Sequence, residues 1–61
     1  MPSHDKLHRL VLARSEALQA LDDLARELSG EARERVLLAR AVVTWEADRA
    51  IAAALREAAG N

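Results

Sequence analysis

The stretch LSGEAR, residues 28–33, interrupts a sequence that otherwise favours helix at nearly every position. Gly30 can adopt the left-handed backbone conformation that closes a helix, and Glu31 then suits the first turn of a following helix. The pattern predicts a very short turn at Ser29 and Gly30. A single long coiled-coil helix is the rival, because one glycine costs a helix only about 1 kcal/mol. We favour an antiparallel hairpin, since it packs leucine on alanine within the chain.

The segment before this turn is expected to form a helix over about residues 3–28. Ser3 is a good N-cap and Asp5 suits the positive end of the helix dipole. At about 100° per residue, one face of this helix is apolar and the opposite face is charged or polar. The apolar face comprises Leu7, Leu10, Val11, Ala17, Leu18, Leu21, Leu24, Ala25 and Leu28. We expect Leu7, Leu18, Leu21 and Leu28 to anchor the hairpin.

The segment after the turn is expected to form a second helix over about residues 31–58. Small residues make one stripe that lets a neighbouring helix come close: Ala32, Val36, Ala39, Val43, Ala47, Ala50, Ala54 and Ala58. Larger apolar residues continue around the helix beyond this stripe. A helix that is apolar over more than half of its circumference is normally buried on more than one side.

One partner helix cannot cover such an apolar arc, and a lone hairpin would leave a patch of the kind that marks an interface. We therefore predict an all-α fold with a single domain over residues 1–61, an antiparallel helical hairpin that dimerises into a four-helix bundle. The residues expected between chains are Leu37, Leu38, Trp45, Ile51 and Leu55. A lone tryptophan on a helix is more often packing or interface than a ligand platform.

Composition also favours association. A chain of 61 residues exposes too much surface per residue to build a large core, and it has no cysteine for disulfides or thiolate metal sites. The formal net charge of −1 gives no pull towards nucleic acid or an anionic membrane. No apolar run approaches the roughly 20 residues that span a bilayer. We expect a soluble, cytoplasmic protein.

Arg14 lies within the apolar stripe of the first helix, where a charge is costly unless it is paired. In a hairpin that turns at residues 29 and 30, Arg14 lies level with residues 45 and 46. Glu46 is therefore the expected ion-pair partner, and Trp45 could stack on the guanidinium. A structural pair that fixes register is the favoured interpretation, with an arginine reserved for a phosphate or carboxylate ligand as the alternative.

His4 and His8 lie one helical turn apart and are within reach of one metal ion. Zinc normally takes three or four protein ligands, so the missing ones would come from the end of the second helix, such as Glu57, or from another subunit. Solvated surface histidines are the simpler interpretation. Zinc or haem binding through His4 and His8 stays open as an alternative, as does pH sensing.

No phosphate-binding loop, activated nucleophile or carboxylate pair beside a pocket is present in the sequence. A bundle of this size also has little room for a substrate cavity. An enzyme is therefore not expected. The sequence favours an interaction or structural module that binds a second copy of itself or another helical protein.

In length, near-equal helices, tiny turn and implied dimerisation, the chain resembles the Rop family of small plasmid regulators. The resemblance implies a dimeric four-helix bundle and, as an alternative function, RNA binding. The RNA-facing surface of that family uses basic and amide side chains around an exposed phenylalanine. This sequence has no phenylalanine, and acidic Glu16, Asp22 and Asp23 lie on its first helix. The same layout also suits an engineered helical scaffold.

Overall fold

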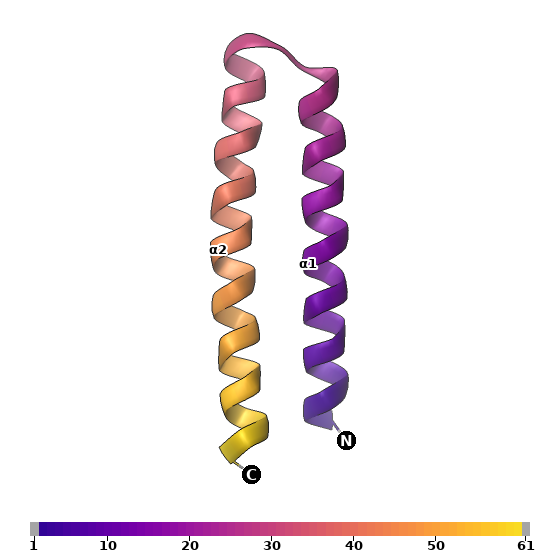
Figure 1. Ribbon diagram of the computed structural model, residues 1–61, viewed down its shortest axis with the longest axis vertical. Coiled ribbons are helices and arrows are strands. Elements are labelled where there is room, and N and C mark those ends of the chain that lie inside the picture. Colours follow the sequence, from indigo (N-terminus) through magenta and orange to yellow (C-terminus); the bar gives the residue numbers. More distant parts are fainter. Residues whose placement is uncertain (1, 61) are drawn as a thin grey trace.

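The chain forms a hairpin of two antiparallel helices. The computed structural model describes the backbone of residues 2–60 and the side chains of residues 5–60. Helix α1 spans Pro2–Glu27 and helix α2 spans Gly30–Gly60. The two helices lie side by side, with both chain ends at the same end of the molecule (Figure 1). The prediction of an all-helical hairpin is confirmed, and the rival of one continuous helix is wrong.

The turn between the helices is made by Leu28 and Ser29, one residue earlier than expected. The amide of Leu28 donates a hydrogen bond to the carbonyl of Ala25, 3.2 Å away, which closes the last turn of α1. Gly30 then has a φ of 59°, the left-handed conformation expected of a glycine beside a helix end. Helix α2 continues to Gly60, two residues beyond the expected end.

The core lies along the line where the two helices meet. Among the described side chains, those buried are Leu18 (9% exposed), Ala25 (3%) and Ala54 (2%). The other leucines expected to anchor the hairpin, Leu7, Leu21 and Leu28, are half-buried. Half-buried side chains on α2 include Val36, Val43, Ala47, Ile51 and Ala58. The core is therefore one narrow seam between a leucine-rich and an alanine-rich helix.

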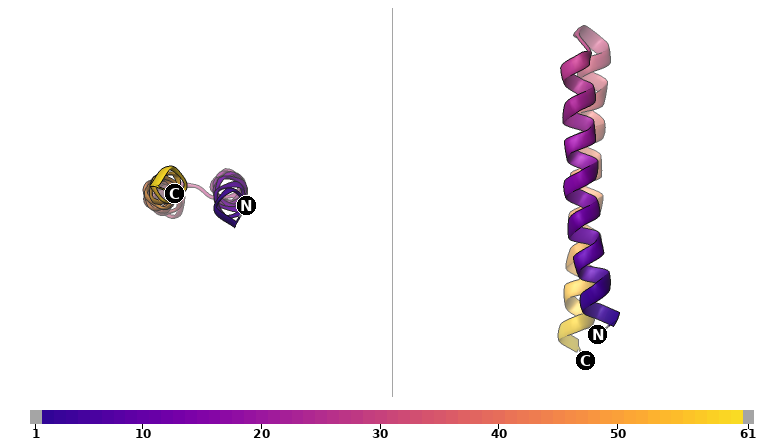
Figure 2. Two further views of the ribbon diagram at one scale, coloured as in Figure 1. Left: turned by 90° about the horizontal axis from the view of Figure 1, so that it is seen from below. Right: turned by 90° about the vertical axis from the view of Figure 1, so that its right-hand side faces the viewer.

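The hairpin is a single layer that is open on both sides (Figure 2). Its extents are 48 × 15 × 8 Å between Cα atoms, and its radius of gyration is 14.3 Å. A compact domain of this length has a radius of gyration of about 10.5 Å. The accessible surface of 4700 Å² exceeds the roughly 3900 Å² expected for a compact protein of this mass. About 800 Å² of extra surface is thus left uncovered.

Ion pairs connect the helices at three levels. Arg14 Nε donates to Asp48 Oδ1 at 2.9 Å, Arg40 Nε donates to Asp22 Oδ1 at 2.7 Å, and Lys6 Nζ lies 3.5 Å from Glu57 Oε2. All six side chains are at least one third exposed. Pairs this exposed are each worth about 1 kcal/mol or less. They help to set the register of the hairpin and add little to its stability.

The expected ion pair between Arg14 and Glu46 is wrong. Arg14 bonds to Asp48 instead, and Glu46 lies 3.6 Å from Arg49 on its own helix. Two residues along a helix differ by about 200° around its axis, so Glu46 and Asp48 lie on different sides of α2. The predicted partner lies within one helical turn of the observed one along α2. It lies on a different side of α2, however, and does not face Arg14.

Candidate interaction surface

The three most exposed large apolar side chains of α2 lie on the side that faces away from α1. Leu38 is 68% exposed, Trp45 63% and Val42 59%. Leu38 lies two residues after half-buried Val36, which places it about 200° around the helix from the hairpin core. Trp45 is related in the same way to half-buried Val43. These side chains therefore do not take part in the core of the hairpin.

The exposed apolar residues belong to a longer regular row. Leu38, Val42, Trp45, Arg49, Ala52 and Arg56 follow one another at alternating spacings of four and three residues. This spacing keeps all six on one side of a helix and is the pattern of a coiled-coil contact line. We call this row the outer seam. Its N-terminal half, Leu38 to Trp45, is apolar, and its C-terminal half carries two arginines.

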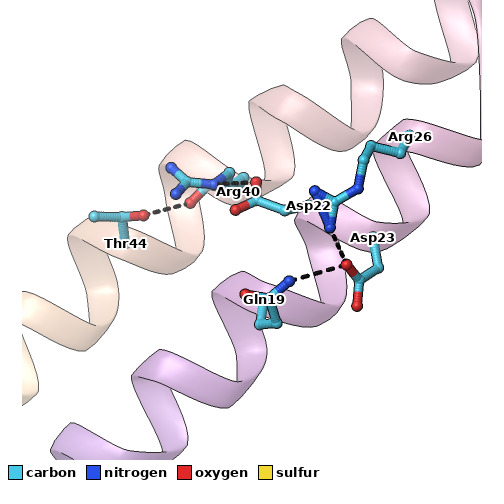
Figure 3. A network of polar contacts seen from close by, with 6 residues as sticks. All are labelled: Gln19, Asp22, Asp23, Arg26, Arg40 and Thr44. Carbon is cyan, nitrogen blue, oxygen red and sulfur yellow. Dashed lines mark hydrogen bonds and ion pairs between the residues drawn. The ribbon is translucent and has the colours of Figure 1, made fainter.

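The surface around the apolar N-terminal half of the outer seam exposes no unpaired charge. Within residues 37–45 the charged side chain is Arg40, and it reaches across to Asp22 of α1 (Figure 3). The hydroxyl of Thr44 donates to the carbonyl of Arg40 at 2.8 Å, so its polar group is satisfied locally. The stretch can therefore be covered by another chain without desolvating an unpaired charge.

Trp45 is partly covered by a neighbour on its own helix. The guanidinium carbon of Arg49 lies 5.2 Å from the centre of the Trp45 ring, a distance typical of a cation–π contact. We expected Arg14 to stack on this ring, and the structure assigns that place to Arg49. The spacing of four residues between tryptophan and arginine on a helix is the sequence signal that could have found it.

The outer surface of α1 is more polar than that of α2. Asp23 accepts hydrogen bonds from Gln19, at 2.9 Å, and from Arg26 (Figure 3). The bond from Arg26 lowers the pKa of the Asp23 carboxyl below its ordinary value, and the bond from Gln19 adds to this. Leu12 is 51% exposed among such polar neighbours. The larger continuous apolar surface therefore belongs to α2.

Four of the five residues expected between chains are exposed in the hairpin. Leu37 is 41% exposed and Leu55 51%, besides Leu38 and Trp45. Ile51 is half-buried and so shares in the core between the helices. Val42 was not among the expected interface residues, although it lies between Leu38 and Trp45 on the outer seam. The alternating spacing of four and three residues in the sequence could have predicted its position on this row.

His8 lies at the open end of the hairpin, in a shallow groove lined by Leu7, Val11, Leu55 and Ala58. The side chain of His4 lies outside the described residues. Glu57, considered as a further ligand, lies beside Lys6. Among the described residues there is no group of three side chains able to hold a metal ion. Zinc or haem binding by His4 and His8 stays a prediction that the structure does not test.

Neither helix, over the described residues, is both long enough and apolar enough to cross a membrane. Comparison with known proteins gave no family: no protein-family model, curated protein or solved structure matches the chain.

Proposed function

We propose that this chain is a self-associating interaction module without catalytic activity, whose partner is a second copy of the same hairpin. The observation that carries the proposal is the exposed apolar surface of α2, where Leu38, Val42 and Trp45 are each more than half exposed. Isolated apolar residues are normal on a protein surface, but a contiguous patch marks an interface. Here three large side chains adjoin on one helix.

The size of the uncovered surface agrees with a dimer. The hairpin has about 800 Å² more accessible surface than a compact protein of its mass. A standard interface covers about 800 Å² on each partner. Burying the outer side of α2 against a second copy would therefore bring each chain close to the surface of an ordinary folded domain.

The small core supports the same conclusion. In the described part of the hairpin, the buried side chains are Leu18, Ala25 and Ala54. A core of this size contributes too little to offset the conformational entropy of ordering some 60 residues, which is about 1 kcal/mol or more for each. Small helical proteins without disulfides or metals commonly gain the missing stability by association. The assembly that results has four helices.

The proposal is tested by the mass of the protein in solution. Sedimentation equilibrium or light scattering of the wild-type chain should give about twice the chain mass of 6.7 kDa. The combined variant Val42→Glu with Trp45→Ala should shift the mass towards that of one chain, because both residues lie in the exposed apolar surface of α2. The reason is that a glutamate carboxylate would be buried unpaired at the interface while the largest apolar contact is lost.

Leu12→Glu is the matched control, because Leu12 is similarly exposed but lies on the polar outer surface of α1. This variant should keep the mass of the wild type. A wild-type chain that stays folded and has the mass of a single hairpin at every concentration would contradict the proposal. A wild-type mass that rises only when another helical protein is added would assign the surface to that partner instead.

A further inference from the structure

We propose that two hairpins associate through the outer seams of their α2 helices, running antiparallel, with the two-fold axis between Val42 and Trp45. This inference rests on the proposed self-association and adds its surface and direction. The outer seam has the alternating spacing of a coiled-coil contact line over Leu38 to Arg56. Trp45, the largest side chain of the seam, and Val42 lie on either side of this axis, and both are more than half exposed in the single hairpin.

Packing in this arrangement joins unlike residues across the axis. In an antiparallel coiled coil, each a position of one helix packs opposite a d position of the other. On the outer seam, Val42, Arg49 and Arg56 are the a positions, and Leu38, Trp45 and Ala52 are the d positions. Val42 of each chain then lies opposite Trp45 of its partner, and Leu38 lies opposite Arg49. The stem of Arg49 can cover the partner's leucine while its guanidinium stays at the ring of Trp45 and reaches water. Two tryptophans thus lie at the centre of the interface.

The charges at the two ends of the seam select the antiparallel direction. Glu34 lies one turn before Leu38 on the exposed side of α2, and Arg56 ends the seam. Among the described residues these two make no ion pair within the chain, whereas Glu31 pairs with Arg35 and Glu46 with Arg49. An antiparallel dimer brings Glu34 of each chain within about one turn of Arg56 of the other. A parallel dimer would place like charges together.

Disulfide trapping tests the direction, because the chain has no cysteine of its own. Arg35→Cys and Ala52→Cys are made as separate single variants. In the proposed register Arg35 lies level with Ala52 of the partner, while each is about 25 Å from its own copy. Oxidation of a mixture should therefore give mainly the mixed disulfide, and oxidation of either variant alone should give little. A disulfide needs Cα atoms within about 7 Å.

Charge reversal tests the same arrangement without new bonds. Glu34→Arg and Arg56→Glu, each alone, should raise the dissociation constant of the dimer about tenfold, because two attractive pairs become repulsive. The double variant Glu34→Arg with Arg56→Glu should return it to near the wild-type value. Glu16→Arg is the matched control, since Glu16 is exposed on α1 and away from the seam, and it should leave the constant unchanged.

The outcomes separate this inference from the proposed function. A wild-type dimer in which each cysteine variant forms a disulfide with its own copy, and in which the double charge reversal restores nothing, would overturn the antiparallel seam and leave self-association standing. A wild-type chain that remains a single hairpin would overturn both. Helix content measured by circular dichroism checks that each variant still folds.

Discussion

At the scale of the residue, charged side chains on the inner side of the helices are tolerated because each finds a partner across the hairpin. Arg40 is half-buried and lies between Val36 and Val43 on the side of α2 that faces α1. Its guanidinium reaches Asp22 at 2.7 Å, with side chains 39% and 38% exposed. The pair therefore keeps part of its hydration, and the cost of desolvation stays small.

Removing one partner of this pair should lower the stability of the hairpin by a small but measurable amount. Asp22→Ala leaves the half-buried Arg40 without its acceptor, so the free energy of unfolding should fall by about 1 kcal/mol. Urea denaturation followed by circular dichroism measures this change. Asp23→Ala is the control, because the partners of Asp23 lie on its own helix. An equal loss of unfolding free energy in the two variants would show that the ion pair between the helices does not stabilise the hairpin more than the contacts within α1 do.

At the scale of the element, the turn depends on one glycine. The φ of Gly30 is 59°, and an added Cβ would meet no atom within 4 Å. The requirement for glycine is thus conformational, since an L-residue in the left-handed region crowds its own backbone. Nothing in the surroundings of Gly30 would prevent a larger side chain.

Gly30→Ala should therefore lower the free energy of unfolding by about 1 kcal/mol, the cost of placing one L-residue in the left-handed conformation. Thermal or urea unfolding measures it. Gly60→Ala is the control, because Gly60 has an ordinary helical φ and equally open surroundings. That variant should be neutral or slightly stabilising, since alanine favours helix more than glycine does. Equal behaviour of the two variants would contradict a special turn conformation at Gly30.

At the scale of the whole molecule, the two helices form one layer 8 Å thick between Cα atoms. Such a layer buries a single seam and leaves the other sides of both helices in water. Helix α1 is better suited to this exposure because its outer side is largely charged, although Val11, Leu12 and Leu24 are each about half exposed. Helix α2 does not, since Leu38, Val42 and Trp45 lie on its outer side. The imbalance between the two helices is what makes association the expected state.

If association supplies much of the stability, unfolding should depend on protein concentration. Mass action then adds about 1.4 kcal/mol to the free energy of unfolding of a dimer for each tenfold rise in concentration. Thermal unfolding followed by circular dichroism over a hundredfold range should show a midpoint that rises steadily. A midpoint that is the same at all concentrations would indicate that each hairpin unfolds alone.

The sequence by itself determined the two helices, the turn beside Gly30 and the antiparallel hairpin. These features depend on local properties: helix propensity, the apolar period of each segment and the conformational freedom of one glycine. It also indicated that α2 has more apolar surface than α1 can cover. The exposed Leu37, Leu38, Trp45 and Leu55 agree with that reasoning.

Only the tertiary structure decided how each helix is rotated about its own axis. Because of that rotation, Arg14 pairs with Asp48 instead of Glu46, and Ile51 is half-buried on the side of α2 that faces α1. The physical reason is that each residue advances about 100° around a helix. Two residues that are one or two positions apart in the sequence therefore lie on different sides of the helix. Rotation is fixed by packing between the helices, and no local pattern within either segment contains it.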